Sequence, residues 1–436
     1  MVARSSEPRS GNMQTPRIWR ASWLHTGSRF PVAIAVFPAA TIVFLLGLGA
    51  GSWIGCSGAT EVNRASVAEL QVDPAGASIS GVDSTYTFSV RALDSSGNLI
   101  PSPAVTWSSL NANVATMEAG TGKATAVASG QVTISAELDG LVSYGLLTVA
   151  VPGEAPVSRW IESRLTSETL EAVWGTSPTN IYAVGSLGII LHYDGSRWNT
   201  MPSGVNEILR GVWGASPNDV YTVGSQGSIL HYDGVGWRGV DYPGSSESLY
   251  DVWGSSPNDV FVVGDGGTIL HYDGTSWTTM RFTGIARLLT SVWGVSPTDV
   301  SAVASNGTIY QYDGKFWNKS SDGVGEPLKA VWCPSADDWY AAGAAGTVLY
   351  MAGATRYRIG WTAMSRVTDE FLFDLSGTSS DNVYAVGDSG TILHYDGDTW
   401  SQLVSGTTNW LFGVWATSSG TVLAVGREGT VLLGQN

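Results

Sequence analysis

Short apolar runs separated by turn residues recur along the second two thirds of the chain. The unit Leu249–Met280 contains four of them, at Leu249–Trp253, Val260–Val263, Thr268–Tyr272 and Trp277–Arg281. None is as long as an ordinary helix, and Asp-Gly between runs rich in β-branched and aromatic residues is typical of a β-hairpin. The pattern therefore predicts four short antiparallel strands per unit.

The unit repeats seven times. The Val-Trp-Gly triplet begins at Val173, Val212, Val252 and Val292, and altered forms begin at Val331, Leu375 and Val414. The steps are 39 or 40 residues, with one step of 44. A fixed period of this length, with four strands per unit, predicts a β-propeller.

The two ends of the repeat region complement each other. The last unit stops at Asn436 after three strands, and the segment Ser158–Arg164 before the first unit matches a fourth strand around Trp160. We therefore expect residues 158–436 to form a closed seven-bladed propeller, with 158–169 as the closing strand. Closure leaves no exposed sheet edge.

A second domain is predicted at residues 67–151. Its Thr85–Val90 stretch alternates with period two, as a half-buried strand does. The segments Val105–Ser109, Asn113–Thr116 and Ala124–Ile134 resemble the bacterial Ig-like group 2 (BIG2) domain. That resemblance implies a small β-sandwich that serves surface proteins as a spacer and sometimes as an adhesive module. Residues 57–66 are expected to be a tether and 152–157 a linker.

The N-terminal residues 1–56 are expected to direct export. Five arginines precede the apolar stretch Pro31–Ile54, which is long enough to cross a bilayer. The run Trp53–Cys56 resembles the lipobox of bacterial lipoproteins, which implies lipidation of Cys56; the alternative is an uncleaved signal anchor. Both interpretations attach the protein to a membrane of the bacterial cell envelope, with everything after Cys56 facing the periplasm or the cell surface.

The propeller repeats resemble the W-G-x-S-P-x-D-V-Y-A-V-G and L-H-Y-D-G-x-x-W repeats of exported bacterial envelope proteins, which are allied to BNR and sialidase-type propellers. The adjacent Asp273 and Gly274 depart from the spacing of the sialidase Asp-box, and the arginine motifs of sialidases are absent. The resemblance therefore implies the fold and does not imply hydrolysis. The chain is expected to be all-β.

The charge of the chain limits the kinds of partner that its exported part can bind. The formal net charge is −15, and residues 157–436 hold −13 of it, whereas residues 1–56 carry +4. A nucleic acid or an anionic lipid needs a basic footprint, so neither is expected as partner of the exported part. With only two cysteines, the chain has neither a disulfide framework nor a Cys-based zinc site.

Repeated polar residues are expected to be structural. Four histidines occupy one repeat position, too far apart around a ring to share a metal. Repeated aspartates are expected to cap turns. Neither a metal nor a cofactor is expected, and Cys333 is expected to be a buried, inert thiol. The histidines are His192, His231, His271 and His394; the aspartates are Asp219, Asp259 and Asp299, and Asp194, Asp233, Asp273, Asp313 and Asp396.

The positions that vary are the candidates for ligand binding. The residue after the first leucine of each unit changes between acid, base and aromatic, although its neighbours stay nearly constant. The turns between the second and third strands also vary, and both sets should lie on the face around one mouth of the channel. Loops and rims on a rigid scaffold are where binding is usually placed; drift of unconstrained positions is the alternative. The residues are Glu171, Arg210, Tyr250, Thr290, Lys329, Phe373 and Phe412.

The 44-residue step suggests an insertion in the fifth unit. It is assigned to the connection Ile359–Glu370 between the fifth and sixth units, which carries Trp361 and Arg366 as further candidates on the same face.

The sequence thus predicts an envelope binding or scaffold protein that is not an enzyme, with a protein or polysaccharide as partner. The first alternative is a glycan hydrolase or lyase that uses Glu171, Asp251 and Asp374, because such enzymes need converging carboxylates. The second is a purely structural envelope protein.

Overall fold

The computed structural model describes residues 67–435, apart from 102, 129, 151–156, 158, 245, 281–287, 322–324, 354–359 and 418–419. The N-terminal segment, Cys56, the tether and all of the linker except Val157 lie outside the described residues. Among the described residues, no helix is long and apolar enough to cross a membrane.

The first domain is a β-sandwich. A four-stranded sheet in the order β2-β9-β8-β5 and a three-stranded sheet β3-β7-β6 enclose a core that contains Phe88 and Trp107, and β1 pairs with β4. Its strands are β1 Val67–Asp73, β2 Gly76–Ser80, β3 Thr85–Thr87, β4 Ser89–Asp94, β5 Thr106–Ser109, β6 Ala115–Met117, β7 Lys123–Ala126, β8 Gly130–Leu138 and β9 Leu141–Ala150.

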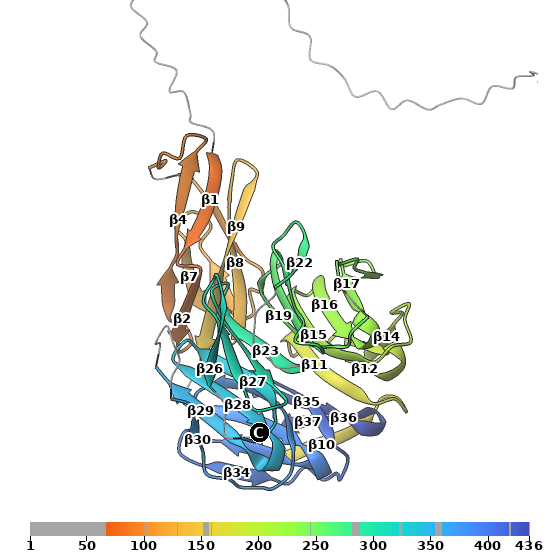
Figure 1. Cartoon of the computed structure of the whole chain (residues 1–436). Helices are drawn as coiled ribbons and strands as arrows, with labels where there is room; N and C mark the ends of the chain where they lie inside the picture. The colour runs from red at the N-terminus through yellow and green to blue at the C-terminus, as the bar shows by residue number, and fades with distance from the viewer. Residues whose placement is uncertain are drawn as a thin grey trace, which may run out of the picture. The chain divides into compact units, whose positions relative to one another are not determined.

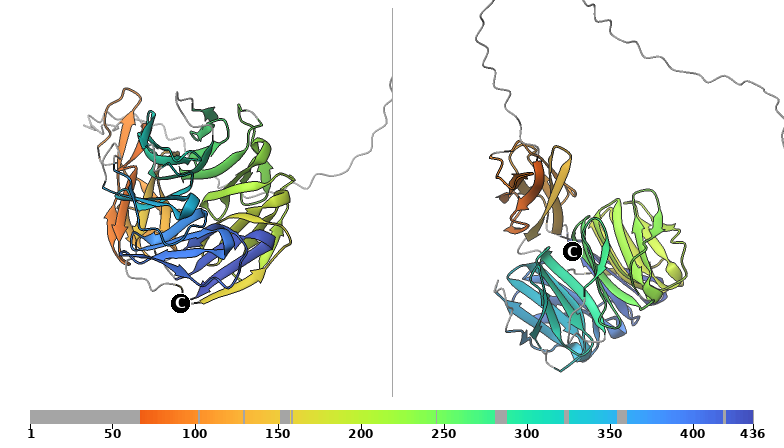
Figure 2. Two further views of the ribbon diagram at one scale, coloured as in Figure 1. Left: turned by 60° about the horizontal axis from the view of Figure 1, so that its bottom comes forward. Right: turned by 45° about the horizontal axis from the view of Figure 1, so that its top comes forward.

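Seven four-stranded sheets follow in residues 159–435, and each is one blade. They succeed one another in chain order around a ring (Figure 2). Blade one is β11 Leu170–Ser177, β12 Asn180–Gly185, β13 Ile190–Tyr193 and β14 Trp198–Met201. Blade two is β15 Leu209–Ser216, β16 Asp219–Gly224, β17 Ile229–Tyr232 and β18 Trp237–Gly239. Blade three is β19 Leu249–Ser256, β20 Asp259–Gly264, β21 Ile269–Tyr272 and β22 Trp277–Thr279.

The other blades keep this plan. Blade four is β23 Leu289–Ser296, β24 Asp299–Ala304, β25 Ile309–Tyr312 and β26 Trp317–Ser321. Blade five is β27 Leu328–Ser335, β28 Asp338–Gly343, β29 Val348–Ala352 and β30 Thr362–Ala363. Blade six is β31 Leu372–Ser379, β32 Asn382–Gly387, β33 Ile392–Tyr395 and β34 Trp400–Leu403. Blade seven is β35 Leu411–Ala416, β36 Val422–Gly426, β37 Thr430–Gln435 and β10 Arg159–Arg164.

The chain closes its own ring in blade seven. Strand β10 pairs antiparallel with β37, from Arg159 opposite Gln435 to Arg164 opposite Thr430 (Figure 1). The last blade thus takes its outer strand from the start of the propeller. The prediction of an all-β chain with an Ig-like sandwich and a propeller is confirmed.

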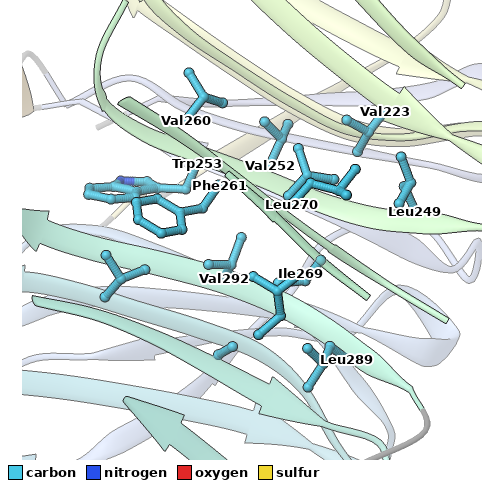
Figure 3. Close-up of a cluster of buried hydrophobic side chains, with 14 of the residues drawn as sticks. Val223, Leu249, Val252, Trp253, Val260, Phe261, Ile269, Leu270, Leu289 and Val292 are labelled. Atoms are coloured by element: carbon cyan, nitrogen blue, oxygen red, sulfur yellow. The ribbon is translucent and has the colours of Figure 1, made fainter. Parts of the chain in front are cut away.

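Large aromatic residues pack between consecutive blades. In blade three, Trp253 and Phe261 lie with Val252 and Leu270 in a cluster that extends to Val292 of blade four (Figure 3). Trp253 is fully buried. Apolar area removed from water stabilises at about 25 cal/mol per Å², so these layers supply much of the stability of the ring.

Five of the six strand-one tryptophans pack on a glycine of the next blade. A Cβ added at Gly294 would lie 2.5 Å from Cη2 of Trp253, and one added at Gly175 would lie 3.0 Å from Cη2 of Trp415. The second contact joins blade seven to blade one. Only glycine leaves enough room for the indole ring at these positions.

Three blades depart from the tryptophan–glycine pair. Blade six has Ser376 in place of the tryptophan, and blade seven has Ala416 in place of the glycine that would face it; Ser376 Oγ accepts a hydrogen bond from the Ala416 N–H at 3.1 Å. A small residue on one side therefore accompanies a larger residue on the other. In blade five, Cys333 takes the glycine position and is 1% exposed, in a cluster against which Trp293 packs.

The structure corrects the place of the insertion in blade five. Met351 precedes Trp361 by ten residues, whereas Tyr312 precedes Trp317 by five in blade four. Because β30 begins at Thr362, Trp361 holds the position of the strand-four tryptophan. The extra residues lie between strands three and four, at the end of the blade opposite the one expected from the sequence.

The Ig-like domain contacts the far ends of several strand-one segments. Residues 63–436 cluster as one compact unit. Gln131 Nε2 donates to the Gly294 carbonyl at 3.1 Å, and Thr133 Oγ1 donates to the Ser255 carbonyl at 3.1 Å. The domain is therefore hydrogen-bonded to the propeller.

The packing rule makes a prediction about coupled substitutions. Gly294→Ala should destabilise by about 1–3 kcal/mol, as overpacking of a filled core does. In a Trp253→Ser background, which recreates the natural Ser376–Ala416 pair, the same change should cost less than half as much, because the three nearest atoms to the new Cβ all belong to Trp253. Denaturant unfolding of the four proteins measures this coupling. An equal cost in both backgrounds would contradict the rule.

Candidate functional site

A β-bulge directs the variable residues into the channel. In every blade the pairing of strand one with strand two shifts directly after the leading leucine, as between Leu249 and Asp251, so that Tyr250 has no partner in the register. A bulge turns a side chain away from simple alternation. Successive residues such as Tyr250 and Asp251 can therefore both line the channel.

All seven variable residues line one cavity of about 120 Å³. Asp251, Asp374 and Ser291, each from the next position of strand one, line it as well. The seven are Glu171, Arg210, Tyr250, Thr290, Lys329, Phe373 and Phe412. The structure thus brings together residues that are up to 241 positions apart in the sequence.

The two other candidates lie elsewhere. Trp361 is half-buried and packs against the cluster that contains Val295 and Leu328, so its expected place in a ligand-binding loop is wrong. Arg366 is in the connection from β30 to β31 and lies 3.6 Å from the Asp369 carboxylate. Gly346, in the turn between strands two and three, donates its N–H to the Glu370 carbonyl. The connection therefore lies at the end of the blade where strand one starts, but Arg366 does not line the cavity.

Cations and a tyrosine form one arc of the cavity. The guanidinium carbon of Arg210 lies 5.1 Å from the ring centre of Tyr250, and Lys329 Nζ lies 5.4 Å from it. Cations at this distance are attracted to the face of the ring. Burial lowers the pKa of the Lys329 ammonium, and the carboxylates of Asp251 and Glu171 oppose that shift.

Aromatic rings form the opposite arc. The rings of Phe373 and Phe412 are 4.9 Å apart, and Phe371 stacks on Phe373 at 5.1 Å. Trp410 lies 5.9 Å from Phe373 and carries the guanidinium of Arg427 over its ring at 3.6 Å. Blades six and seven thus give the mouth an apolar wall that adjoins the cationic arc at Lys329.

The Thr290 hydroxyl is used in hydrogen bonds within the propeller. Its hydroxyl donates to the Leu328 carbonyl at 2.9 Å, with a second contact to the Val303 carbonyl at 3.2 Å, and the residue is 7% exposed. The hydroxyl is therefore bonded to backbone, which leaves only the rest of the side chain at the cavity wall. The sequence did not indicate this.

Two aspartates fasten neighbouring blades. Asp251 accepts the N–H of Val252 at 2.8 Å and that of Val292, in the next blade, at 2.9 Å. Asp374 does the same with Leu375 at 2.8 Å and Val414 at 2.9 Å. Both oxygens of each carboxylate are thus bonded to backbone.

Burial shifts the acids of the cavity upward. It raises the pKa of the Asp374 carboxyl to about 7, against the lowering effect of its two backbone donors. Burial also raises the pKa of Asp251, and that of Glu171 despite the nearby charge of Arg210. All three acids therefore hold protons more strongly than they would in water.

The repeated histidines bond inside their own blades. His231 Nε2 lies 2.7 Å from Asp219 Oδ1, and His394 Nε2 lies 2.7 Å from Asn382 Oδ1. In blade five, Tyr350 replaces the histidine and donates to Asp338 at 2.6 Å. The expected turn-capping role of the aspartate at the start of strand two is wrong, because it accepts from strand three. Asp219, Asp259 and Asp299 all do so.

The second set of repeated aspartates caps the turn between strands three and four. Asp273 Oδ1 accepts the N–H groups of Thr275 and Ser276, each at 2.9 Å. The Thr275 hydroxyl, followed by these backbone bonds, lowers the pKa of the Asp273 carboxyl. Asp194, Asp233, Asp313 and Asp396 make the same pair of bonds. Among the described residues, no group of three His, Cys, Asp or Glu side chains is placed to hold a metal ion.

Comparisons with known proteins identify both folds. Residues 66–140 match the model of the Bacterial Ig-like domain (group 2). No curated protein matches the sequence. Among solved structures, "YCF48 bound to D1 peptide" is 17% identical with a TM-score of 0.54, covering 66% of this chain and 98% of that one.

Two further structures share the propeller fold. YCF48 from Cyanidioschyzon merolae is 16% identical with a TM-score of 0.53, covering 64% of this chain and 99% of its own. The WD40 repeats of RRP9 are 9% identical with a TM-score of 0.56, covering 65% of this chain and 99% of their own. At these identities the likeness establishes the fold alone.

Asp374 leads to a prediction about pH. Its folded pKa is above that of the unfolded chain, so the native state keeps a proton between about pH 4 and 7 that the unfolded chain releases. Its contribution to stability is therefore full below pH 4 and is lost as the pH rises to 7. Asp374→Asn, which stays neutral, should remove this dependence: the unfolding free energy of the wild type minus that of the variant should fall from pH 4 to 7. Parallel curves would contradict the assignment.

Proposed function

We propose that the chain is a binding protein of the bacterial cell envelope that recognises its ligand in the cavity at the strand-one starts. One observation carries the proposal. The repeated polar residues bond within or between blades, whereas the seven residues at the bulge are of six different types and converge on one cavity. An asymmetric set of side chains on a symmetric scaffold is what recognition of a single ligand requires.

A peptide or protein segment is the favoured partner. The cavity holds Arg210, Tyr250 and two phenylalanines, and Arg and aromatic residues are enriched in binding hot spots. The similar YCF48 propeller is described as bound to a D1 peptide, so a propeller of this kind does bind peptide in another protein. A polysaccharide is the other class of partner to be tested.

The enzymatic alternative has less support. A sialidase-like hydrolase or a lyase on this propeller would use Glu171, Asp251 and Asp374, and all three line the cavity. However, Asp251 and Asp374 each bond two backbone N–H groups that would be left without partners if the carboxylates moved to a substrate. These two acids therefore serve the fold better than they would serve catalysis.

Substitutions at the cavity test the binding proposal. The full-length chain in detergent is screened on peptide and glycan arrays, and each hit is measured again with Phe373→Ala and Tyr250→Ala. Both variants should weaken binding at least tenfold with little change in melting temperature, because a central aromatic hot spot is worth about 2 kcal/mol or more.

The matched control is Phe316→Ala, in the turn between strands three and four of blade four. Phe316 is 68% exposed and lies at the opposite end of its blade, so its loss should leave affinity intact. If Phe316→Ala weakens binding and the cavity variants do not, the proposed face is wrong. If every variant binds as the wild type does, the ligand is bound outside the cavity and the proposed site is wrong. If the arrays yield no ligand, the purely structural alternative is favoured.

The proposed membrane attachment has its own test. Cys56 ends the apolar stretch of the export segment and is the proposed lipidation site. Metabolic labelling with a fatty-acid analogue should tag the wild type and Cys333→Ala, and should not tag Cys56→Ala. Labelling that survives Cys56→Ala, or no labelling of the wild type, would leave the uncleaved signal anchor as the means of attachment.

A further inference from the structure

Two cations in the cavity form no close ion pair with an acid of the described residues. Arg210 Nε is buried without a hydrogen-bond partner among the described residues, and its Nη2 reaches only Ser225 Oγ at 3.4 Å. Lys329 makes no side-chain hydrogen bond or ion pair within the described part of the chain, and its ammonium group faces the ring of Tyr250. Glu171 and Asp251 act on Lys329 electrostatically but form no hydrogen bond with it, so N–H donors of both cations remain for an anion.

Most other polar groups of the cavity are already hydrogen-bonded within the protein. Asp251, Asp374 and the Thr290 hydroxyl are bonded to backbone. The uncommitted groups at the wall are therefore chiefly N–H donors, which need acceptor atoms on the ligand. Of the three acids that line the cavity, Glu171 alone makes no hydrogen bond to the described residues, and it lies in the ring between Arg210 and Phe412.

An apolar group has its place beside the cations. Phe373 and Phe412 are in contact with each other and follow Lys329 in the order of the blades. A cavity of about 120 Å³ admits a side chain or a chain end. The ligand part that enters must therefore combine a small apolar body with acceptor oxygens at one end.

Building on the proposed function, we infer that the cavity binds the carboxylate end of an apolar group. Arg210 and Lys329 hold the carboxylate oxygens, and Phe373 and Phe412 contact the apolar part. Glu171 can accept an N–H such as the last amide of a peptide. The shared chemistry has two sources, the C-terminal residue of a peptide and a free organic acid.

Small probe molecules distinguish recognition of a carboxylate from nonspecific binding of an apolar group. N-acetyl-L-phenylalanine, its uncharged amide and 3-phenylpropionate are titrated by NMR against the full-length chain in detergent. The acid should bind at least tenfold more tightly than the amide, and Arg210→Gln or Lys329→Met should reduce that preference to less than threefold. Lys315→Gln, in an exposed turn at the opposite end of blade four, should preserve the preference.

The comparisons between probes and between variants distinguish the possible outcomes. Stronger binding of N-acetyl-L-phenylalanine than of 3-phenylpropionate indicates a peptide end, and the reverse indicates an organic acid. Equal binding of acid and amide, both weakened by Phe373→Ala, overturns the carboxylate inference and leaves the proposed function standing. Because Arg210→Gln and Lys329→Met act on different blades, a folding defect in one variant, seen as a lower melting temperature, leaves the other as the test. If none of the three probes binds, the inference is also overturned. If the array ligands bind every cavity variant as tightly as the wild type, the proposed function itself is overturned.

Discussion

The contact between a strand-one tryptophan and a glycine of the next blade is the constraint on which the propeller depends. An indole ring fills the space that a Cβ at Gly294 or Gly175 would need, and the same contact joins the last blade to the first. Where the tryptophan is lost, at Ser376, the glycine is replaced by Ala416, whereas Trp293 is kept opposite Cys333 in blade five. Close packing explains the Ser376–Ala416 exchange, because interiors tolerate neither overlap nor voids. The ring is thus fixed by residues that cannot vary freely.

Residues can vary between blades only at positions that this packing does not constrain. The bulge at the start of strand one supplies such a position in every blade and points it into the channel. The seven residues at the bulge are therefore free to become a cationic arc and an aromatic arc. Behind them, Asp251 and Asp374 fasten adjacent blades, so that the ligand-facing layer rests on a rigid support.

The sequence predicted the architecture because repetition is visible without coordinates. The period, the turn residues and Trp160 were enough for seven blades and for the pairing of β10 with β37. It placed Glu171 to Phe412 at one mouth for a simple geometric reason, since equivalent positions of a repeat share one face. It failed where a residue's role depends on contacts across blades. Trp361 is a packed repeat tryptophan, because the insertion precedes it, and the Thr290 hydroxyl is taken by a carbonyl of the next blade.

The central claim is that recognition belongs to the end of the propeller where strand one begins. Hydrogen–deuterium exchange of the full-length chain, with and without the tightest array ligand, measures this directly. The account predicts slower exchange at the starts of β15, β19, β27, β31 and β35 and at the adjoining turns between strands two and three. Protection confined to the turns between strands three and four, around Asp233 and Asp273, would contradict it.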